Sequence, residues 1–375
     1  MEFWAGRLAR REMALAILLC PFYHSFIKNS SAYAPSACGG WGIVILGGCR
    51  PMKHKRFGKT DLWVSEMCLG TMMFGDRCSE SEAERILGQA REAGVTFLDT
   101  AAMYCDGRTE EILGRLLRSQ RTEFVIASKV HKGIDAGSIL TSIDESLSRL
   151  QTDYLDLYLI HWPKAGMRLD EIMRALDHVV KQGKARYVGC CNYPAYLFLL
   201  SNAEAAQHAF SEMACLQIPY NLIERGAEVE VLPMAHTLGL AVTAYRPLAM
   251  GLLAGKYQHG AELPEDSRAI TDERIGRWLT AHGEDLARLA DYAQQHQLKI
   301  GEVAIAWLRA SPAVTCPIVG VSSLAQFQAS LPAFELELEP QEREYISNLF
   351  NTEVKEESGG AYKALRRNLT LLSGS

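Results

Sequence analysis

Four polar side chains stand at or just beyond the ends of short apolar runs that predict buried strands. Asp99, Lys129 and His161 each lie at or near the end of such a run, and Tyr104 follows Asp99 after a short turn sequence. Short apolar runs flanked by turn residues suit strands that are buried on both faces. A carboxylate at the end of a buried strand needs a partner, and the Lys129 ammonium is a natural one.

Together these four groups could move a proton to or from an oxygen atom. The ordinary pKa of tyrosine is about 10, which makes a phenol a poor acid or base at neutral pH. The Lys129 ammonium is expected to favour the phenolate and lower the pKa of Tyr104, while Asp99 holds Lys129 charged. A neutral His161 could orient a substrate oxygen beside the phenol. The set predicts chemistry at a carbonyl oxygen, and the hydride would come from a nicotinamide, because no side chain carries one.

Strand-like and helix-like stretches alternate through most of the chain. Eight strands are predicted at 66–70, 95–99, 123–130, 154–161, 185–191, 214–219, 240–245 and 314–319. Helices are predicted at 80–92, 109–117, 138–150, 169–181, 195–209, 228–238, 301–309 and 324–331. A polar turn at 58–61 predicts a hairpin before the first of the eight strands. This pattern predicts an α/β fold, a (β/α)8 TIM barrel with an N-terminal hairpin, rather than an open doubly wound sheet.

The predicted barrel gives the four polar residues a common place. Active sites in such barrels lie at the carboxyl ends of the strands. Asp99, Lys129 and His161 would therefore meet at one mouth although they lie far apart in the sequence. Each residue alone has an ordinary interpretation, such as a capping acid, a surface cation or a core histidine. The set as a whole favours a catalytic site.

Composition bounds the class of protein. The chain has 375 residues, is 48% hydrophobic and has a formal net charge of -5. These values predict a soluble globular protein of one large or two ordinary domains, without a nucleic-acid-binding patch or a membrane span. Its ten cysteines contain no C-x-x-C spacing, so neither a metal site nor a disulfide framework is predicted. This cysteine usage is typical of a reducing cytosol, and a cytoplasmic location is expected.

The two ends of the sequence differ from the part between them. In the leader 1–51, arginines precede the apolar run 13–20, which is the charge order of an export signal, and 31–34 is a poor cleavage site. The favoured interpretation is an extension from a misassigned start, with the working protein beginning at Met52. Export and an accessory segment are the alternatives. We expect a domain at 52–350 and a polar C-terminal tail at 351–375.

Several motifs, in one order, carry a resemblance to a known family. They are Leu98-Asp99-Thr100-Ala101 with Tyr104, Glu110-Glu111-Ile112-Leu113-Gly114, Ser128-Lys129, the stretch 147–158 leading to His161-Trp162, and the stretch 183–189. From about 52 to about 349 the chain resembles an aldo-keto reductase, closest in motif style to the branch of potassium-channel β-subunit-like and bacterial oxidoreductases. The resemblance implies that Tyr104 is the general acid and base. It also implies that Lys129 and Asp99 tune Tyr104 and that His161 orients the substrate.

The resemblance further implies an extended nicotinamide cofactor across the barrel mouth. The cofactor-binding residues that it implies are Gly70, Thr71, Met72, Asp99, Cys191, Asn192, Gln217, Tyr245, Arg246, Pro247, Leu248, Lys256, Arg268, Gly320, Ser322 and Gln326. Asn192 and Gln217 would hold the carboxamide, and Tyr245 would stack on the nicotinamide. Lys256 would balance the charge of the pyrophosphate. Cys191 stands where family members usually have a serine, and cysteine is the weaker hydrogen bonder.

The adenosine end of the cofactor follows the family pattern less closely. Arg268, Ser322 and Gln326 resemble a site for the adenosine phosphate, which favours NADP(H) as the cofactor. Ala329 and Ser330 stand where the family commonly has the Glu-Asn pair that reads the adenine. NAD(H) is therefore the alternative cofactor.

Two functions are open on this basis. The favoured one is an enzyme, an NAD(P)-dependent oxidoreductase that interconverts a small-molecule carbonyl and its alcohol. The alternative is a cofactor-binding regulatory or scaffold subunit, as the resemblance to channel β-subunits implies. Met72, Met73, Phe74, Met103 and Trp162 could line an apolar substrate pocket or could equally be packing residues. The stretch 260–282 is predicted to be a mobile flap over the cofactor, and the specific substrate and the oligomeric state stay open.

Overall fold

The structure is a computed structural model that describes residues 52–130, 133–255 and 272–350. The chain divides into two units, Met1–Gly42 and Ile43–Ser375, and every described residue belongs to the second. The predictions made for the leader and for the C-terminal tail lie outside the described residues.

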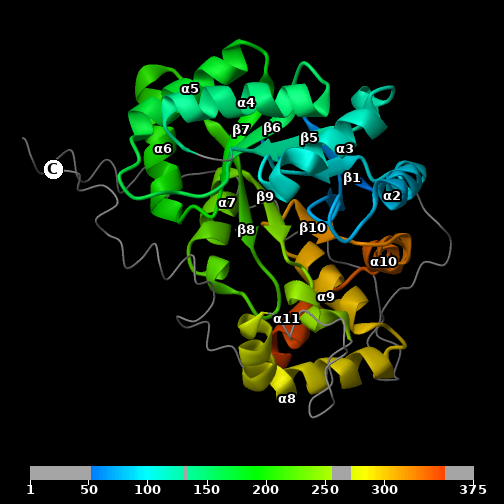
Figure 1. Cartoon of the computed structure of the whole chain (residues 1–375). Coiled ribbons are helices and arrows are strands. Elements are labelled where there is room, and N and C mark those ends of the chain that lie inside the picture. The colour runs from blue at the N-terminus through cyan, green and yellow to red at the C-terminus, as the bar shows by residue number, and fades with distance from the viewer. Residues whose placement is uncertain (1–51, 131–132, 256–271, 351–375) are drawn as a thin grey trace, which may run out of the picture. The chain divides into compact units, whose positions relative to one another are not determined.

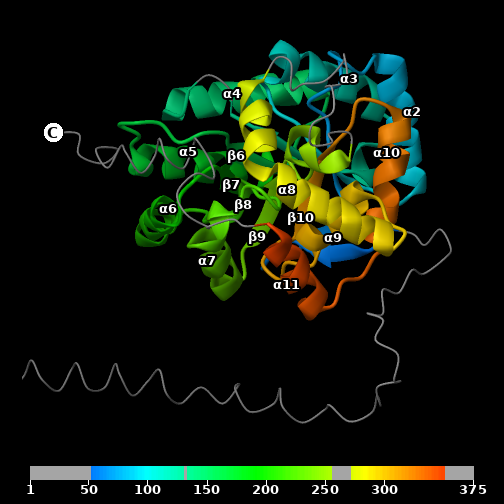
Figure 2. The same ribbon diagram turned by 90° about the horizontal axis from the view of Figure 1, so that it is seen from below.

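Eight parallel strands close into a barrel. They are β3 (Cys68–Gly70), β4 (Phe97–Asp99), β5 (Val125–Lys129), β6 (Leu155–Ile160), β7 (Ala185–Cys191), β8 (Met213–Pro219), β9 (Ala241–Tyr245) and β10 (Cys316–Gly320). Their order around the barrel is β10-β3-β4-β5-β6-β7-β8-β9, so each strand lies beside its neighbours in the chain and the last pairs with the first. Helices surround this ring of strands (Figure 1, Figure 2). The predicted TIM barrel is confirmed.

A hairpin covers the end of the barrel at which the strands begin. Its two strands, β1 (His54–Arg56) and β2 (Trp63–Ser65), pair antiparallel, as the sequence predicts. The Ser65 hydroxyl accepts a hydrogen bond of 3.1 Å from the backbone N–H of Phe97, the first residue of β4. The rings of Phe57 and Phe97 pack edge to face with their centroids 5.7 Å apart. Because the hairpin occupies this end, the opposite end is left for the site.

Eight helices lie close to their predicted ranges. They are α2 (Glu80–Glu92), α3 (Arg108–Leu117), α4 (Ala136–Leu150), α5 (Leu169–Lys181), α6 (Ala195–His208), α7 (Val231–Leu238), α9 (Ile300–Arg309) and α10 (Leu324–Ser330). Side chains cap several of them. The Ser79 hydroxyl caps α2 by accepting from the backbone N–H of Glu82, and the Asp135 carboxylate caps α4 in the same way. Gly239 ends α7 with a φ of 63°, a left-handed conformation that favours glycine.

The expectation of a flap over 260–282 is wrong for its last part, and its first part, 260–271, lies outside the described residues. The residues from Glu273 onward form the start of α8 (Glu273–Gln295). The Asp272 carboxylate accepts a hydrogen bond of 3.0 Å from the backbone N–H of Arg274 and so begins the helix. The charged composition that suggested a loop belongs to the exposed face of this helix, because Ile275 and Leu289 on its other face are fully buried.

The sequence analysis also missed a helix near the end of the described chain. This helix, α11 (Pro340–Leu349), begins with proline at its first position, where the missing N–H costs nothing. The backbone N–H of Glu339 donates to the Glu342 carboxylate at 2.9 Å, one half of a capping box. Buried Ile346 and Leu349 pack in the main core.

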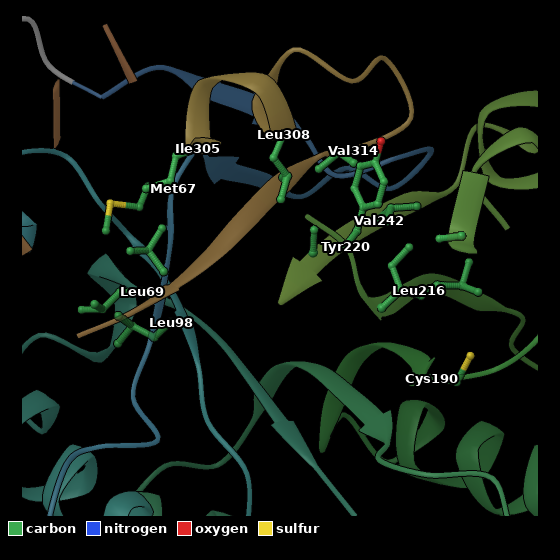
Figure 3. Packing of buried hydrophobic residues seen from close by; sticks show 14 of the residues in the cluster. Met67, Leu69, Leu98, Cys190, Leu216, Tyr220, Val242, Ile305, Leu308 and Val314 are labelled. Carbon is green, nitrogen blue, oxygen red and sulfur yellow. The ribbon is translucent and has the colours of Figure 1, made fainter. Parts of the chain in front are cut away.

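The main hydrophobic core lies between the barrel and its helices. Leu69 of β3 and Leu98 of β4 are paired neighbours, and Figure 3 shows their side chains beside each other in this core. Ile305 and Leu308 of α9 reach the same core from outside. Each fully buried leucine or isoleucine side chain contributes roughly 1.5–3 kcal/mol to stability. This packing holds the strands, and therefore the strand ends, in fixed positions.

A second cluster fills the inside of the barrel. The inner cluster consists of Phe57, Leu62, Val64, Cys68, Phe97, Ala127, Leu157, Leu159, Cys191, Cys215, Ala241, Cys316 and Ile318. Its cysteines are free and buried, so they behave as the small hydrophobes that the sequence predicts. Burial raises the pKa of the Cys191 thiol well above its ordinary value.

Candidate active site

Asp99 and Lys129 meet at the end of the barrel where the strands finish. Asp99 is the last residue of β4 and Lys129 the last of β5. The Lys129 ammonium donates a hydrogen bond of 2.8 Å to Oδ2 of Asp99, and both side chains are almost completely buried. A buried ion pair is tolerated only when its geometry is good and its other polar atoms are satisfied. The second Asp99 oxygen, Oδ1, accepts a hydrogen bond of 2.8 Å from the Gln217 amide.

All three N–H donors of the Lys129 ammonium have acceptors. Besides Asp99, Nζ donates to the Thr100 carbonyl oxygen at 2.7 Å and to the Tyr104 hydroxyl at 3.2 Å. Burial is the largest single effect and acts to lower the pKa of Lys129, but the Asp99 carboxylate and the other neighbouring groups together outweigh it, and the pKa lies above its ordinary value. Lys129 is therefore a fixed positive charge within hydrogen-bond distance of the phenol.

The bond from Lys129 also decides what the Tyr104 hydroxyl can do. A phenol has one donor hydrogen and can accept through its oxygen. Because Lys129 donates to the Tyr104 oxygen, the phenol hydrogen is left for a different acceptor. That arrangement suits the donation of a proton to a substrate oxygen.

The expected direction of the Tyr104 pKa shift is wrong. Burial raises the pKa of Tyr104 to about 12, and the Lys129 ammonium offsets only part of that rise. The loss of water around the phenolate destabilises it more than the nearby ammonium stabilises it. At neutral pH the Tyr104 side chain is a neutral phenol.

A tight turn after Tyr104 aims its side chain. Cys105 and Asp106 have φ values of 49° and 54°, in the left-handed region, and Gly107 follows with a φ of 93°. The Gly107 position has little space for a side chain, since an added Cβ would lie 2.8 Å from the Arg149 side chain. Left-handed non-glycine residues are costly and are concentrated at functional sites.

His161 faces Tyr104 from the end of β6, two strands away from β4 in the barrel. It follows directly after β6, and its ring lies edge to face with the Tyr104 ring at a centroid distance of 6.2 Å. The Asn192 amide donates to the His161 carbonyl oxygen at 3.0 Å, which fixes the backbone at this point. The structure therefore brings Asp99, Tyr104, Lys129 and His161 to one place.

Asn192, Gln217 and Tyr245 form a second polar group beside the first. The Tyr245 hydroxyl donates to Oδ1 of Asn192 at 2.7 Å, and the backbone N–H of Asn192 donates to the Gln217 carbonyl oxygen at 2.9 Å. Asn192 has a φ of 63°, so its backbone is left-handed. The Gln217 side chain donates through Nε2 to Asp99, which leaves its Oε1 as an acceptor. Amide donors and acceptors are what a carboxamide requires, so these residues fit a nicotinamide.

The three predicted residues at the end of β3 and just after it play different parts. The backbone N–H and the hydroxyl of Thr71 both donate to the Asp99 carbonyl oxygen, at 3.0 and 2.9 Å. Thr71 is fully buried, as is Gly70, which is the partner of Asp99 in the sheet. Met72 is 46% exposed. Thr71 therefore positions Asp99, and Met72 is the one of the three whose side chain is open to a ligand.

Cys191 is not brought to the surface of the site. Its side chain is fully buried in the inner cluster. The Cys191 side chain therefore packs in the inner cluster, and the predicted contact between Cys191 and a cofactor stays a prediction. Its neighbour Asn192 lies beyond the end of β7 and presents the polar group.

Arg246 is held by a partner that the sequence analysis missed. Its guanidinium binds the Glu224 carboxylate at 3.1 Å and lies 5.0 Å from the centre of the Tyr245 ring. Glu224 is buried, and the Asn221 amide donates to it at 3.0 Å and to the Arg246 carbonyl oxygen at 3.0 Å. Pro247 is buried beside them. A buried acid close to the predicted cofactor residues could have been suspected from its position after β8.

The remaining predicted cofactor residues fall into three groups. Leu248 packs against the main core, while Lys256 and Arg268 lie outside the described residues. Gly320 and Gln326 are exposed near the end of β10. Gln326 Oε1 accepts from the backbone N–H of Ser322 at 2.9 Å.

Of the five candidate pocket residues, three have exposed side chains and two are packed in the core. Trp162, Met103 and Met72 are 39%, 45% and 46% exposed. Phe74 and Met73 are buried in the main core, so they belong to the packing interpretation. The Trp162 and His161 rings stack with centroids 6.2 Å apart. The site therefore has apolar surface close to Tyr104.

Residues 52–130, 133–255 and 272–350 contain no group of three or more His, Cys, Asp or Glu side chains that could hold a metal ion. In the same part of the chain, no helix combines the length and the apolar character that crossing a membrane requires.

Comparisons with known proteins agree with this geometry. The family model described as Aldo/keto reductase family matches residues 66–350. The chain is 34% identical over 319 residues to the uncharacterized oxidoreductase YrpG of Bacillus subtilis (strain 168), covering 80% of this chain and 96% of that protein. It is 31% identical over 327 residues to the protein tas of Escherichia coli (strain K12), covering 76% and 94%.

Two further relatives extend the comparison. The chain is 31% identical over 302 residues to a probable voltage-gated potassium channel subunit beta of Arabidopsis thaliana, covering 76% of this chain and 92% of that protein. The crystal structure of a thermostable aldo-keto reductase in complex with the inhibitor epalrestat matches with a TM-score of 0.66 and 28% identity. It covers 80% of this chain and 100% of that one. Members of this family generally use NAD(P)H, and the family match together with the oxidoreductase relatives supports an oxidoreductase. The chain belongs to the aldo/keto reductase family.

Proposed function

We propose that this chain reversibly reduces an aldehyde or ketone to an alcohol with hydride from a nicotinamide cofactor and a proton from Tyr104. The observation that carries the proposal is the Lys129 ammonium, which donates to Asp99 at 2.8 Å and to the Tyr104 hydroxyl at 3.2 Å. This arrangement leaves a neutral phenol with its hydrogen directed away from the ammonium.

Each of the four polar residues then has a role. Tyr104 donates its hydrogen to the substrate oxygen, and the Lys129 ammonium stabilises the phenolate that results. Asp99 keeps Lys129 charged. The Gln217 amide donates to the Asp99 carboxylate and holds it in place. The His161 ring lies 6.2 Å from the Tyr104 ring, where it can direct the substrate oxygen towards the phenol.

A nicotinamide, when bound, would supply the hydride. We propose that Asn192 and Gln217 hold its carboxamide and that the ring lies against Tyr245. The described contact that supports this is the bond from Nε2 of Gln217 to Asp99, which leaves Oε1 of Gln217 as the acceptor for a ligand. Oδ1 of Asn192 accepts from the Tyr245 hydroxyl and would exchange that bond for one from the carboxamide. The preference for NADP(H) over NAD(H) rested on Arg268, which lies outside the described residues, and on Ser322 and Gln326. It stays a prediction.

The proposed substrate is a small carbonyl compound or alcohol with an apolar substituent. Met72, Met103 and Trp162 are the exposed apolar side chains near Tyr104 that would contact it. Methionine adapts to substituents of different shapes, which favours a tolerant site.

The test is oxidation of NADPH and NADH, followed by absorbance, with a panel of aldehydes, ketones and sugars. We expect turnover that Tyr104→Phe abolishes while cofactor binding survives, because phenylalanine keeps the ring and loses only the hydroxyl. Equal turnover by the wild type and the Tyr104→Phe variant would contradict the proposed role.

The second candidate is a cofactor-binding regulatory or scaffold subunit with little turnover. The similarity to the plant protein named as a potassium channel subunit beta is the observation that favours it. Tight retention of a nicotinamide cofactor with no turnover of any carbonyl would support this candidate against the enzyme. The complete set of four polar residues supports the enzyme.

We also propose that residues 52–350 form the working domain and that it acts in the cytoplasm. The free, buried cysteines of the inner cluster are consistent with a reducing compartment. N-terminal sequencing of the native protein tests the boundary, and a mature terminus between Ala34 and Gly40 would instead indicate export.

A further inference from the structure

A buried glutamate stands close to the segments that carry Tyr104 and Lys129. Glu110 is the third residue of α3, and its side chain is completely buried. It comes six residues after Tyr104, which begins the tight turn that leads into α3. A buried carboxylate is costly unless it is paired, so its partners show which parts of the structure it holds together.

The first partner of Glu110 is the residue before Lys129. The Ser128 hydroxyl donates a hydrogen bond of 2.5 Å to Oε1 of Glu110. Ser128 and Lys129 are successive residues of β5, and successive side chains of a strand point to opposite faces. Lys129 therefore faces the candidate active site while Ser128 faces α3. The bond to Glu110 fixes β5 directly beside the lysine.

The second partner of Glu110 is Arg149, near the end of α4. Its Nε donates a hydrogen bond of 2.7 Å to Oε2 of Glu110. The Arg149 side chain also packs against Gly107, since a Cβ added at that glycine would lie 2.8 Å from Cδ of Arg149. Gly107 is the last residue of the turn that Tyr104 begins. Arg149 therefore joins Glu110 to the turn that carries the phenol.

The turn after Tyr104 needs such support. Cys105 and Asp106 have left-handed backbones, and strained residues of this kind keep their conformation only when the surrounding structure holds them. Arg149 can give this support because its own position is fixed. Gly114 of α3 lies directly against the backbone of α4, since a Cβ added there would collide with the Arg149 carbonyl oxygen. Helices α3 and α4 therefore meet at Arg149 with no room to shift.

One carboxylate thus fixes both partners of a single hydrogen bond. The Lys129 ammonium donates to the Tyr104 hydroxyl at 3.2 Å, which is at the long end of the range for an N–H···O bond. A displacement of either group by about 1 Å would break this bond, and a misplacement of that size can lower a rate by about 10²-fold. Without the bond, the ammonium no longer lies where the phenolate forms.

We propose that Glu110, together with Arg149 and Ser128, positions Tyr104 against Lys129 for proton transfer. Glu110 is a positioning residue, because it acts on the reacting oxygen through the turn and through β5. The inference rests on the proposed function, since it takes Tyr104 to be the proton donor. The competing explanation is that the pair of Glu110 and Arg149 only stabilises the packing of α3 on α4.

A double-variant cycle separates the two explanations. Carbonyl reduction by the full chain is measured for the wild type, Arg149→Met, Tyr104→Phe and the double variant, at enzyme concentrations high enough to follow slow turnover. We expect Arg149→Met to lower kcat by about 10- to 100-fold, while the dissociation constants of NADH and NADPH stay within about twofold. On the Tyr104→Phe background we expect the same change to lower kcat by less than about twofold, because the hydroxyl that Arg149 helps to position is absent.

The outcomes of this cycle differ for the inference and for the proposed function. Equal losses of kcat on the two backgrounds, or an unchanged kcat in Arg149→Met, would overturn the inference and leave the proposed function intact. A wild-type kcat in Tyr104→Phe would overturn the proposed function, and the inference with it. Arg309→Met is the control for lost stability, because Arg309 pairs with the buried Glu66 at 3.1 Å near the opposite end of the barrel. We expect its kcat to stay within about twofold of the wild type.

A milder variant covers the case in which Arg149→Met does not fold. Ser128→Ala removes one hydrogen bond to Glu110 and keeps the ion pair with Arg149. We expect kcat to fall by about 3- to 10-fold when Tyr104 is present and by less than about twofold on the Tyr104→Phe background. Equal falls on the two backgrounds, or no fall on either, would overturn the inference.

Discussion

The Lys129 ammonium donates to the Tyr104 hydroxyl at 3.2 Å, although the two residues come from different strand ends. This bond has a direction, since an ammonium can only donate and the phenol oxygen must accept. The phenol hydrogen is therefore available to a substrate, and the positive charge lies where a phenolate would form. Burial raises the pKa of Tyr104 to about 12, so the resting group is the acid and not the base.

Replacing Tyr104 by phenylalanine removes the proton donor alone. We expect kcat for carbonyl reduction to fall by about 10²- to 10⁴-fold, the usual contribution of a positioned acid. Steady-state kinetics with NADH and NADPH measure the loss, and cofactor dissociation constants serve as the control. A kcat within about threefold of the wild type would show that another group or water supplies the proton.

The two directions of the reaction should respond to pH in opposite ways. Reduction uses the neutral phenol, and with a pKa of about 12 that form predominates up to about pH 11. Oxidation uses the phenolate, whose fraction rises about tenfold per pH unit below the pKa. We expect kcat/KM for reduction to be flat from about pH 7.5 to 10, and kcat/KM for oxidation to rise. If kcat/KM for reduction already falls as the pH is raised towards about 9, the pKa of Tyr104 is lower than this. The lowering of that pKa by Lys129 would then outweigh the rise caused by burial.

The buried ion pair should be costly to break from one side. Lys129→Met leaves the Asp99 carboxylate buried with only the Gln217 amide, and we expect a loss of about 3–5 kcal/mol in the free energy of unfolding. The double variant Asp99→Asn with Lys129→Met should lose less than the sum of the two single changes. Urea unfolding measures the stability of the two single variants and of the double variant. Lys59→Met, at an exposed position, is the control, and we expect it to change the free energy of unfolding by no more than about 0.5 kcal/mol. Additive losses would contradict the coupling.

A buried arginine away from the catalytic residues should affect stability without affecting catalysis. The Arg309 guanidinium binds the Glu66 carboxylate at 3.1 Å, and both side chains are buried. Glu66 comes two residues before β3, so the pair lies at the end of the barrel where the strands begin. Arg309→Met would leave Glu66 short of a partner, at an expected cost of about 3–5 kcal/mol. Glu66 also pairs with Lys55 at 3.2 Å. Because this partner remains, we expect the loss of stability to lie near the lower end of that range. We expect kcat/KM of the folded variant to stay within about twofold, and a larger loss would mean that this network reaches the site.

The elements that the sequence predicts well are those with a strong local pattern. The strands that carry Asp99 and Lys129 are short apolar runs, and the helices between strands have apolar residues at helical spacing. Helix α8 was missed because its exposed face is charged and because 256–271 before it carries no regular pattern. Helix α11 was missed because its apolar positions are few.

Within the site, the sequence by itself determined which residues meet, because strand order and motif order place Asp99, Lys129 and His161 at the same end of a barrel. Only the tertiary structure decided what surrounds them. Burial by distant segments sets the pKa of Tyr104, gives Gln217 a bond to Asp99, and hides the Cys191 thiol inside the barrel. These properties depend on solvent exclusion and on bonds between strands far apart in the chain, and neither is written in a local run of residues.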